Sequence, residues 1–138
     1  MITSAIEALD ILTLEAVEFD EVGARKILIG GEPQSDTGAL NLELDMQFRC
    51  EENTLSYRVR ATTSAEVAEV VVVVAGHYRA EVELKISPEA ITEFANKVAF
   101  MALFPYIREA VGAMFNRIGL TVVLPIMDAN TISFSFDS

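Results

Sequence analysis

Residues 102–111 read ALFPYIREAV, an apolar helical pattern with a proline at its centre. Residues 87–89 (Ser-Pro-Glu) are typical of a helix start, and Gly119 is typical of a helix end. Because Pro105 removes a backbone donor and disfavours helical angles before it, the pattern predicts one long kinked helix or two helices in line. The positions that keep helical spacing are Ile91, Phe94, Ala95, Val98, Met101, Ala102, Tyr106, Ile107, Ala110, Val111, Met114, Phe115 and Ile118.

Apolar side chains cover more than half of the expected helix circumference between residues 98 and 107. A helix that packs on one sheet needs only an apolar stripe. The surplus therefore predicts a second contact surface, most simply another copy of the same helix.

The segments before this helix have strand patterns. Residues 11–22 alternate apolar and polar, but the phase slips near Ala16, which indicates a β-bulge or a strand that serves two neighbours. Residues 40–49 and 55–62 alternate cleanly around a turn at 51–53 and predict a hairpin. Acids on its first polar face oppose arginines on the next, as cross-strand pairing requires.

Five consecutive valines at residues 70–74 predict a fourth strand that is buried on both faces. We expect a second subunit to cover the extra apolar face, or else the chain's own N-terminal segment. Apolar alternation resumes at 81–86. Residues 1–12 fit either a short helix or the start of a strand, and residues 30–38 are a turn-rich loop.

The chain has 138 residues, is 51% hydrophobic and carries a net charge of −11, which predicts one globular domain over residues 1–138. An acidic surface disfavours nucleic acid and anionic lipid and favours basic partners. Its start carries acids and no basic cluster, and the longest apolar run, residues 98–107, is shorter than the ~20 residues of a membrane helix. A single cysteine, Cys50, excludes an internal disulfide and is expected to be buried or half-buried. We expect a soluble, cytoplasmic protein without membrane insertion.

No residues in the sequence are organised for catalysis. The one histidine, His77, lies near the fourth strand, where a structural or surface role is the more common one. No Cys/His cluster has metal spacing, and the glycines at 30–31 lack the flanking pattern of a phosphate loop. No nucleophile lies beside a base in a known motif. We expect no enzyme activity, no cofactor and no metal.

The opening stretch resembles a motif of the bacterial export chaperone SecB and its SecB-like relatives. That family carries Leu-Phe/Tyr-Pro-Tyr-x-Arg-Glu in its long helix, then a glycine, an apolar run with a proline, and an acidic-small pair. The matching residues are Leu103, Phe104, Pro105, Tyr106, Arg108, Glu109, Leu124, Pro125, Ile126, Asp128 and Ala129. The resemblance covers roughly residues 11–130. It implies an α+β fold in which a four-stranded antiparallel sheet carries a long kinked helix on one face, and assembly into a homotetramer as a dimer of dimers.

The resemblance further implies ATP-independent holding of unfolded polypeptides, such as secretory precursors, in hydrophobic grooves. Burial of client apolar area would supply about 25 cal/mol per Å². The groove residues would be Ile27, Leu28, Ile29, Val122, Val123, Leu124, Ile126 and Met127, although Leu124 and Ile126 equally fit a core role. Phe104, Tyr106, Arg108 and Glu109 would lie at the seam between subunits, although Arg108 and Glu109 also fit an exposed surface pair.

Two departures from the family bear on the partners. In the export chaperone, acids on the outer face of the sheet dock the SecA ATPase. Asp20 matches one of these acids, but the equivalent position in the fourth strand lies in the valine run, which puts SecA docking in doubt. Residues 131–138 resemble a strand or a tail where the family has a helix. The alternatives are a SecB-like chaperone dedicated to the antitoxin of a toxin–antitoxin module, and a non-chaperone domain for apolar ligands or oligomerisation.

Overall fold

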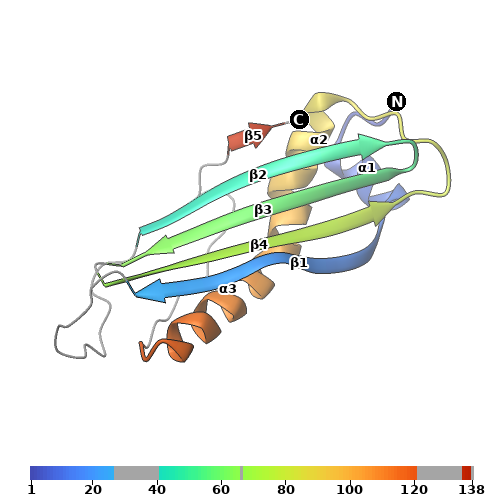
Figure 1. Cartoon of the computed structure of the whole chain (residues 1–138). Helices are drawn as coiled ribbons and strands as arrows, with labels where there is room; N and C mark the ends of the chain where they lie inside the picture. Colours follow the sequence, from blue (N-terminus) through green and yellow to red (C-terminus); the bar gives the residue numbers. More distant parts are fainter. Residues whose placement is uncertain (27–40, 66, 121–134, 138) are drawn as a thin grey trace.

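The computed structural model describes residues 1–26, 41–65, 67–120 and 135–137, and shows one sheet with helices on one face (Figure 1). The strand order is β1-β4-β3-β2-β5, antiparallel except for the parallel pairing of β2 with β5. The elements are α1 (Ala5–Ile11), β1 (Thr13–Lys26), β2 (Asn41–Glu51), β3 (Thr54–Ser64), β4 (Ala68–Arg79), α2 (Pro88–Phe94), η1 (Ala95–Ala99), α3 (Phe100–Arg117) and β5 (Ser135–Asp137).

The predicted hairpin is confirmed in β2 and β3. Every residue of β2 from Asn41 to Glu51 has a partner in β3, without a break in register. The turn that joins the strands uses a positive φ of 48° at Glu52. Leu44 and Met46 on β2 are buried, as the alternating pattern requires.

Two bulges interrupt β1. Its register against β4 shifts between Leu14 and Ala16 and again between Phe19 and Glu21. The slip expected near Ala16 is therefore confirmed, whereas the second one has no counterpart in the sequence pattern. Each bulge inserts one extra residue, and both of these residues are acids.

The long helix is one continuous helical run from Pro88 to Arg117. Ser87 caps its start, because the Ser87 hydroxyl oxygen accepts a hydrogen bond from the Ala90 N–H at 3.1 Å. Pro105 lies inside α3, and the departure from α-helical geometry is the π-helical turn η1 instead. The predicted long helix with an internal proline is therefore confirmed, and the π-helical turn is a second irregularity that the sequence did not reveal. Pro105 is on the exposed side of α3, where water can satisfy the freed carbonyl.

Aromatic residues dominate the core between helix and sheet. Tyr57, Tyr78 and Phe94 form a mutually contacting cluster with ring centroids 5.0 to 6.3 Å apart. The Tyr57 hydroxyl donates to the Ile91 carbonyl at 2.7 Å and so joins β3 to α2. The apolar composition of Pro88–Arg117 would also permit a membrane span, but in this fold the helix buries its apolar face against the sheet.

The outer face of β4 is covered by the chain itself. Val73 and Ala75 are only 2% and 4% exposed. Val73 lies between Glu21 on β1 and Arg60 on β3 in the register, and these two side chains meet above it at 3.6 Å. This observation fits the alternative expectation, that the chain's own N-terminal segment covers the face, and cover by a second subunit stays a prediction. Long charged side chains can cover small apolar residues with their aliphatic stems. Above Val73, the N-terminal strand β1 supplies Glu21 and β3 supplies Arg60.

The ends of the chain supply further contacts. Residues 5–11, which also fitted a strand, form helix α1, with Ser4 as its cap.

The alternation at 81–86 does not produce a strand in the structure. Only Ile86 makes an isolated bridge, which is parallel to Ile2. Without a neighbouring strand, alternation alone cannot form a ladder.

Candidate polypeptide-binding surfaces

The predicted groove residues fall outside the described part of the chain. They are Ile27, Leu28 and Ile29 before β2, and Val122, Val123, Leu124, Ile126 and Met127 after α3. The structure therefore does not test the predicted groove, and these residues stay predictions. What it does describe is the helix-covered face of the sheet and its two edges.

An apolar strip lies where β1 extends beyond the cover of α3. We call it the β1–α3 strip; it consists of Leu14, Phe19, Val22, Met101 and Tyr106, which are all large, apolar and exposed. Phe19 and Tyr106, 43% and 44% exposed, join the two elements through an edge-to-face contact of 6.4 Å between ring centroids. The strip exists because α3 packs chiefly on β4, so the helix-facing side of β1 is left partly open.

At the opposite side of the sheet lies β2, whose outer side pairs with β5 along three residues. Its helix-facing row is apolar and consists of Leu42, Leu44, Met46, Phe48 and Cys50. Leu44 and Met46 in the middle of the strand are buried, Leu42 and Phe48 are half-buried, and Cys50 is exposed. The expectation of a buried or half-buried Cys50 is therefore wrong, because this residue lies at the open end of an edge strand.

The four predicted interface residues divide into two groups. Phe104 is 4% exposed and packs on Phe100 with ring centroids 5.3 Å apart, so its side chain belongs to the core of its own chain. Its prediction as an interface residue is wrong, because helical periodicity turns it towards the sheet. Tyr106, Arg108 and Glu109 are exposed. In the described part of the chain, neither Arg108 nor Glu109 forms an ion pair.

Asp20, the predicted docking acid, is engaged within the chain. Its carboxylate pairs with Arg58 at 3.1 Å. Three more acids of β1 are paired in the same way across the outer face: Glu15 with Arg79 at 3.4 Å, Glu18 with His77 at 2.6 Å, and Glu21 with Arg60 at 3.6 Å. These contacts tie the bulged edge strand to its neighbours, and they leave Asp20 partly neutralised.

His77 lies in a hydrogen-bonded row that the sequence did not reveal. Its Nδ1 lies 2.7 Å from the Ser56 hydroxyl oxygen, and its Nε2 lies 2.6 Å from a Glu18 carboxylate oxygen. The register places Ser56 opposite His77, so a correct strand alignment would have predicted their contact. The row lies across the outer face of the sheet, beside the bulge between Leu14 and Ala16 of β1. We assign it to joining three strands.

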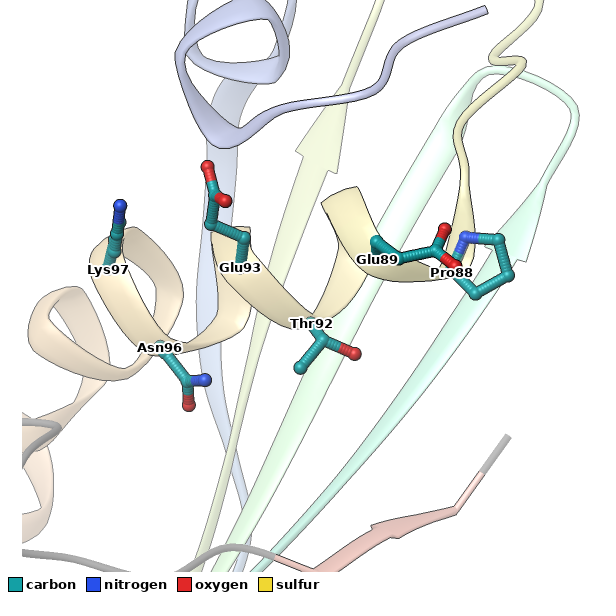
Figure 2. A pocket seen from close by; sticks show the side chains of 6 residues that line it. All are labelled: Pro88, Glu89, Thr92, Glu93, Asn96 and Lys97. Atoms are coloured by element: carbon teal, nitrogen blue, oxygen red, sulfur yellow. The ribbon is translucent and has the colours of Figure 1, made fainter.

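A shallow hollow of about 510 Å³ lies along α2 and η1 (Figure 2). Glu93 and Lys97 line one side, and Thr92 and Asn96 line the other. One Glu93 carboxylate oxygen accepts a hydrogen bond from the Ala5 N–H at 2.8 Å, which fastens the start of α1 to α2. The Asn96 Oδ1 is buried and has no hydrogen-bond partner among the described residues.

The architecture resembles that of a solved chaperone. The Mycobacterium tuberculosis Rv1957 SecB-like chaperone, in complex with a ChAD peptide from the Rv1956 HigA1 antitoxin, matches with a TM-score of 0.77 and 17% identity over 90% of this chain and 93% of that chain. A Streptococcus agalactiae protein of unknown function matches with a TM-score of 0.48 and 13% identity, over 83% and 97% of the two chains. No protein-family model and no curated protein matches the sequence. The chain therefore has a SecB-like fold, as the helix motif predicted.

Proposed function

We propose that this protein is a SecB-like chaperone that holds non-native polypeptides without ATP. The observation that carries the proposal is the fold shared with a chaperone that was solved in complex with a peptide from an antitoxin. The exposed apolar residues of the β1–α3 strip support it, because a holdase needs apolar surface that its own fold leaves uncovered. We include in the proposal a cytoplasmic location and the absence of enzymatic activity.

The proposal includes assembly into a homotetramer built as a dimer of dimers. The β1–α3 strip supports it, since five exposed large apolar residues on the edge strand β1 and the adjoining helix α3 are unusual for a monomer. Tyr106 belongs to this strip, and Arg108 and Glu109 are exposed near it on α3. Charged residues beside an apolar patch are typical of an interface rim.

A dedicated antitoxin chaperone is the second candidate. Asp20 is paired with Arg58, and the valine run leaves β4 without an acid between Val70 and Val74. Both features weaken docking to SecA and, with it, a role in general export. The peptide bound to the Mycobacterium tuberculosis protein comes from an antitoxin, which favours the dedicated role by analogy.

The test compares clients. We expect the protein to suppress light scattering by three unrelated proteins as they unfold on heating, at near-stoichiometric ratios and without ATP. If it protects only an antitoxin encoded beside its own gene, the dedicated role holds. If it protects none of these clients, the chaperone proposal fails.

A further inference from the structure

The outer edge of β2 already holds a strand that comes from far along the chain. Ser135, Phe136 and Asp137 of β5 pair in parallel with Asp45, Met46 and Gln47 (Figure 1). These three pairs are the whole of β5, whereas β2 pairs with β3 along eleven residues. Most of the β2 edge therefore has no partner in β5.

We propose that the edge of β2 is a strand-addition site for extended polypeptide segments, and that β5 occupies it as an internal competitor when no client is bound. The inference rests on the proposed chaperone function and names where and how a client would bind. Strand addition suits unfolded chains, since backbone hydrogen bonds supply affinity without reading a particular sequence.

The two edges of the sheet differ in their fitness for this role. β2 keeps an unbroken register with β3 over its full length, so no bulge interrupts the backbone groups that its outer side presents to an added strand. β1 carries two bulges, which interrupt its backbone groups. The part of the chain that the structure describes thus has one regular edge, and this is the edge on which a strand is seated.

The side chains of β2 specify the chemistry of the added strand. On the helix-facing side, Leu42 and Phe48 lie on either side of the positions paired with β5, and both are half-buried. Next to an added strand, they would pack on apolar side chains. On the outer side, Glu43 and Asp45 form no ion pair within the described residues. We therefore expect preferred segments to alternate apolar and basic residues.

The short length of β5 makes it displaceable. A client segment that spans β2 could form pairs along eleven residues instead of three, so it would outcompete β5. Removal of β5 should in turn tighten client binding. The expected factor is about tenfold, which corresponds to one or two net backbone hydrogen bonds.

The experiment measures binding of a fluorescein-labelled eleven-residue peptide of alternating valine and lysine by anisotropy. Three proteins are compared: the full chain, a chain that lacks residues 135–138, and the full-length variant Phe136→Pro, which places a residue without a backbone N–H opposite Met46 and disfavours strand pairing there. We expect both variants to bind about tenfold more tightly than the full chain, with circular dichroism and melting temperature confirming that they fold.

Matched probes test the binding mode. A valine–glutamate peptide should bind more weakly, because Glu43 and Asp45 repel it. Two N-methylated versions of the lysine peptide, blocked at odd or at even positions, should include one that loses binding. If the full chain suppresses aggregation but neither β5 variant nor N-methylation changes peptide affinity, strand addition is excluded while the chaperone function stands. If the full chain binds no unfolded client at all, the proposed function itself is wrong.

Discussion

At the scale of single residues, close packing between β4 and α3 depends on the absence of a side chain at Gly76. A Cβ at this position would lie 3.1 Å from Leu103 Cδ2, and Leu103 is fully buried. Gly112 on α3 is a natural comparison, because a Cβ there would meet nothing within 4 Å.

We predict that Gly76→Ala lowers the free energy of unfolding by about 1–3 kcal/mol, because the added methyl group overpacks the helix–sheet contact. Gly112→Ala should raise it by about 0.5–1 kcal/mol, because alanine restricts the unfolded chain and fills open space in a helix. Urea unfolding followed by circular dichroism measures both changes. Equal effects of the two substitutions would contradict the packing argument.

Buried tyrosines give the protein a predictable response to alkali. Burial raises the pKa of the Tyr57 hydroxyl, with a further contribution from Tyr78, and burial also raises the pKa of Tyr78. A tyrosine of the unfolded chain ionises near pH ~10, whereas these hydroxyls keep their protons to higher pH in the folded protein. The unfolded state therefore loses protons first.

We predict that the free energy of unfolding is insensitive to these groups below pH ~10 and falls as the pH rises above it. In Tyr57→Phe the fall should be shallower, because one of the two raised groups is gone. At pH 7 the variant should be about 1 kcal/mol less stable through loss of the bond to the Ile91 carbonyl. Urea titrations at pH 7, 10 and 11 measure these differences, and an unchanged alkaline slope would contradict the assignment.

At the scale of elements, the long helix tolerates two irregularities. Pro105 lies within α3, and the π-helical turn η1 lies upstream, at Ala95–Ala99. Pro88, by contrast, lies at the start of α2, where no intrahelical donor is required. Pro105 is therefore expected to lower the free energy of unfolding, whereas Pro88 is expected to have little effect on it.

We predict that Pro105→Ala raises the free energy of unfolding by about 1–3 kcal/mol, since it restores a backbone donor in the helix interior. Pro88→Ala, the control, should change stability by less than about 0.5 kcal/mol or slightly lower it. Thermal and urea unfolding measure both variants. Destabilisation by Pro105→Ala would mean that the proline ring itself is needed for packing.

At the scale of the whole molecule, the two free surfaces suggest a division of roles. The β1–α3 strip offers exposed side chains on a bulged strand, which suits contact with another subunit. The β2 edge offers a regular backbone, which suits strand addition. In this proposal, assembly at one edge would leave the other edge open to clients.

We predict that Phe19→Asp with Tyr106→Asp reduces the assembled species to a smaller one at micromolar concentration, because carboxylates would be buried in the interface. Val82→Asp is the control, because Val82 is 65% exposed and lies outside the strip. Multi-angle light scattering measures the mass of each variant. An unmodified protein that is already monomeric would contradict the assembly proposal.

The sequence alone determined the order of the main strands, the hairpin and the long helix, because these depend on local periodicity, turn residues and caps. Ser87, Pro88 and the alternation over residues 40–49 needed no tertiary information. The helix motif also identified the SecB-like fold. The alternation at 81–86 is typical of a strand, but these residues form none because no neighbouring strand among the described residues is there to pair with them.

Only the tertiary structure decided which surfaces are covered. The bulge at Asp20, the ion pairs above Val73, the burial of Phe104 and the row that joins Ser56, His77 and Glu18 all depend on register between distant strands. The place of β5 beside β2 likewise depends on a pairing across about ninety residues of sequence. Periodicity tells a residue which side of its own element it occupies, but the elements packed against that side set its exposure and its partners.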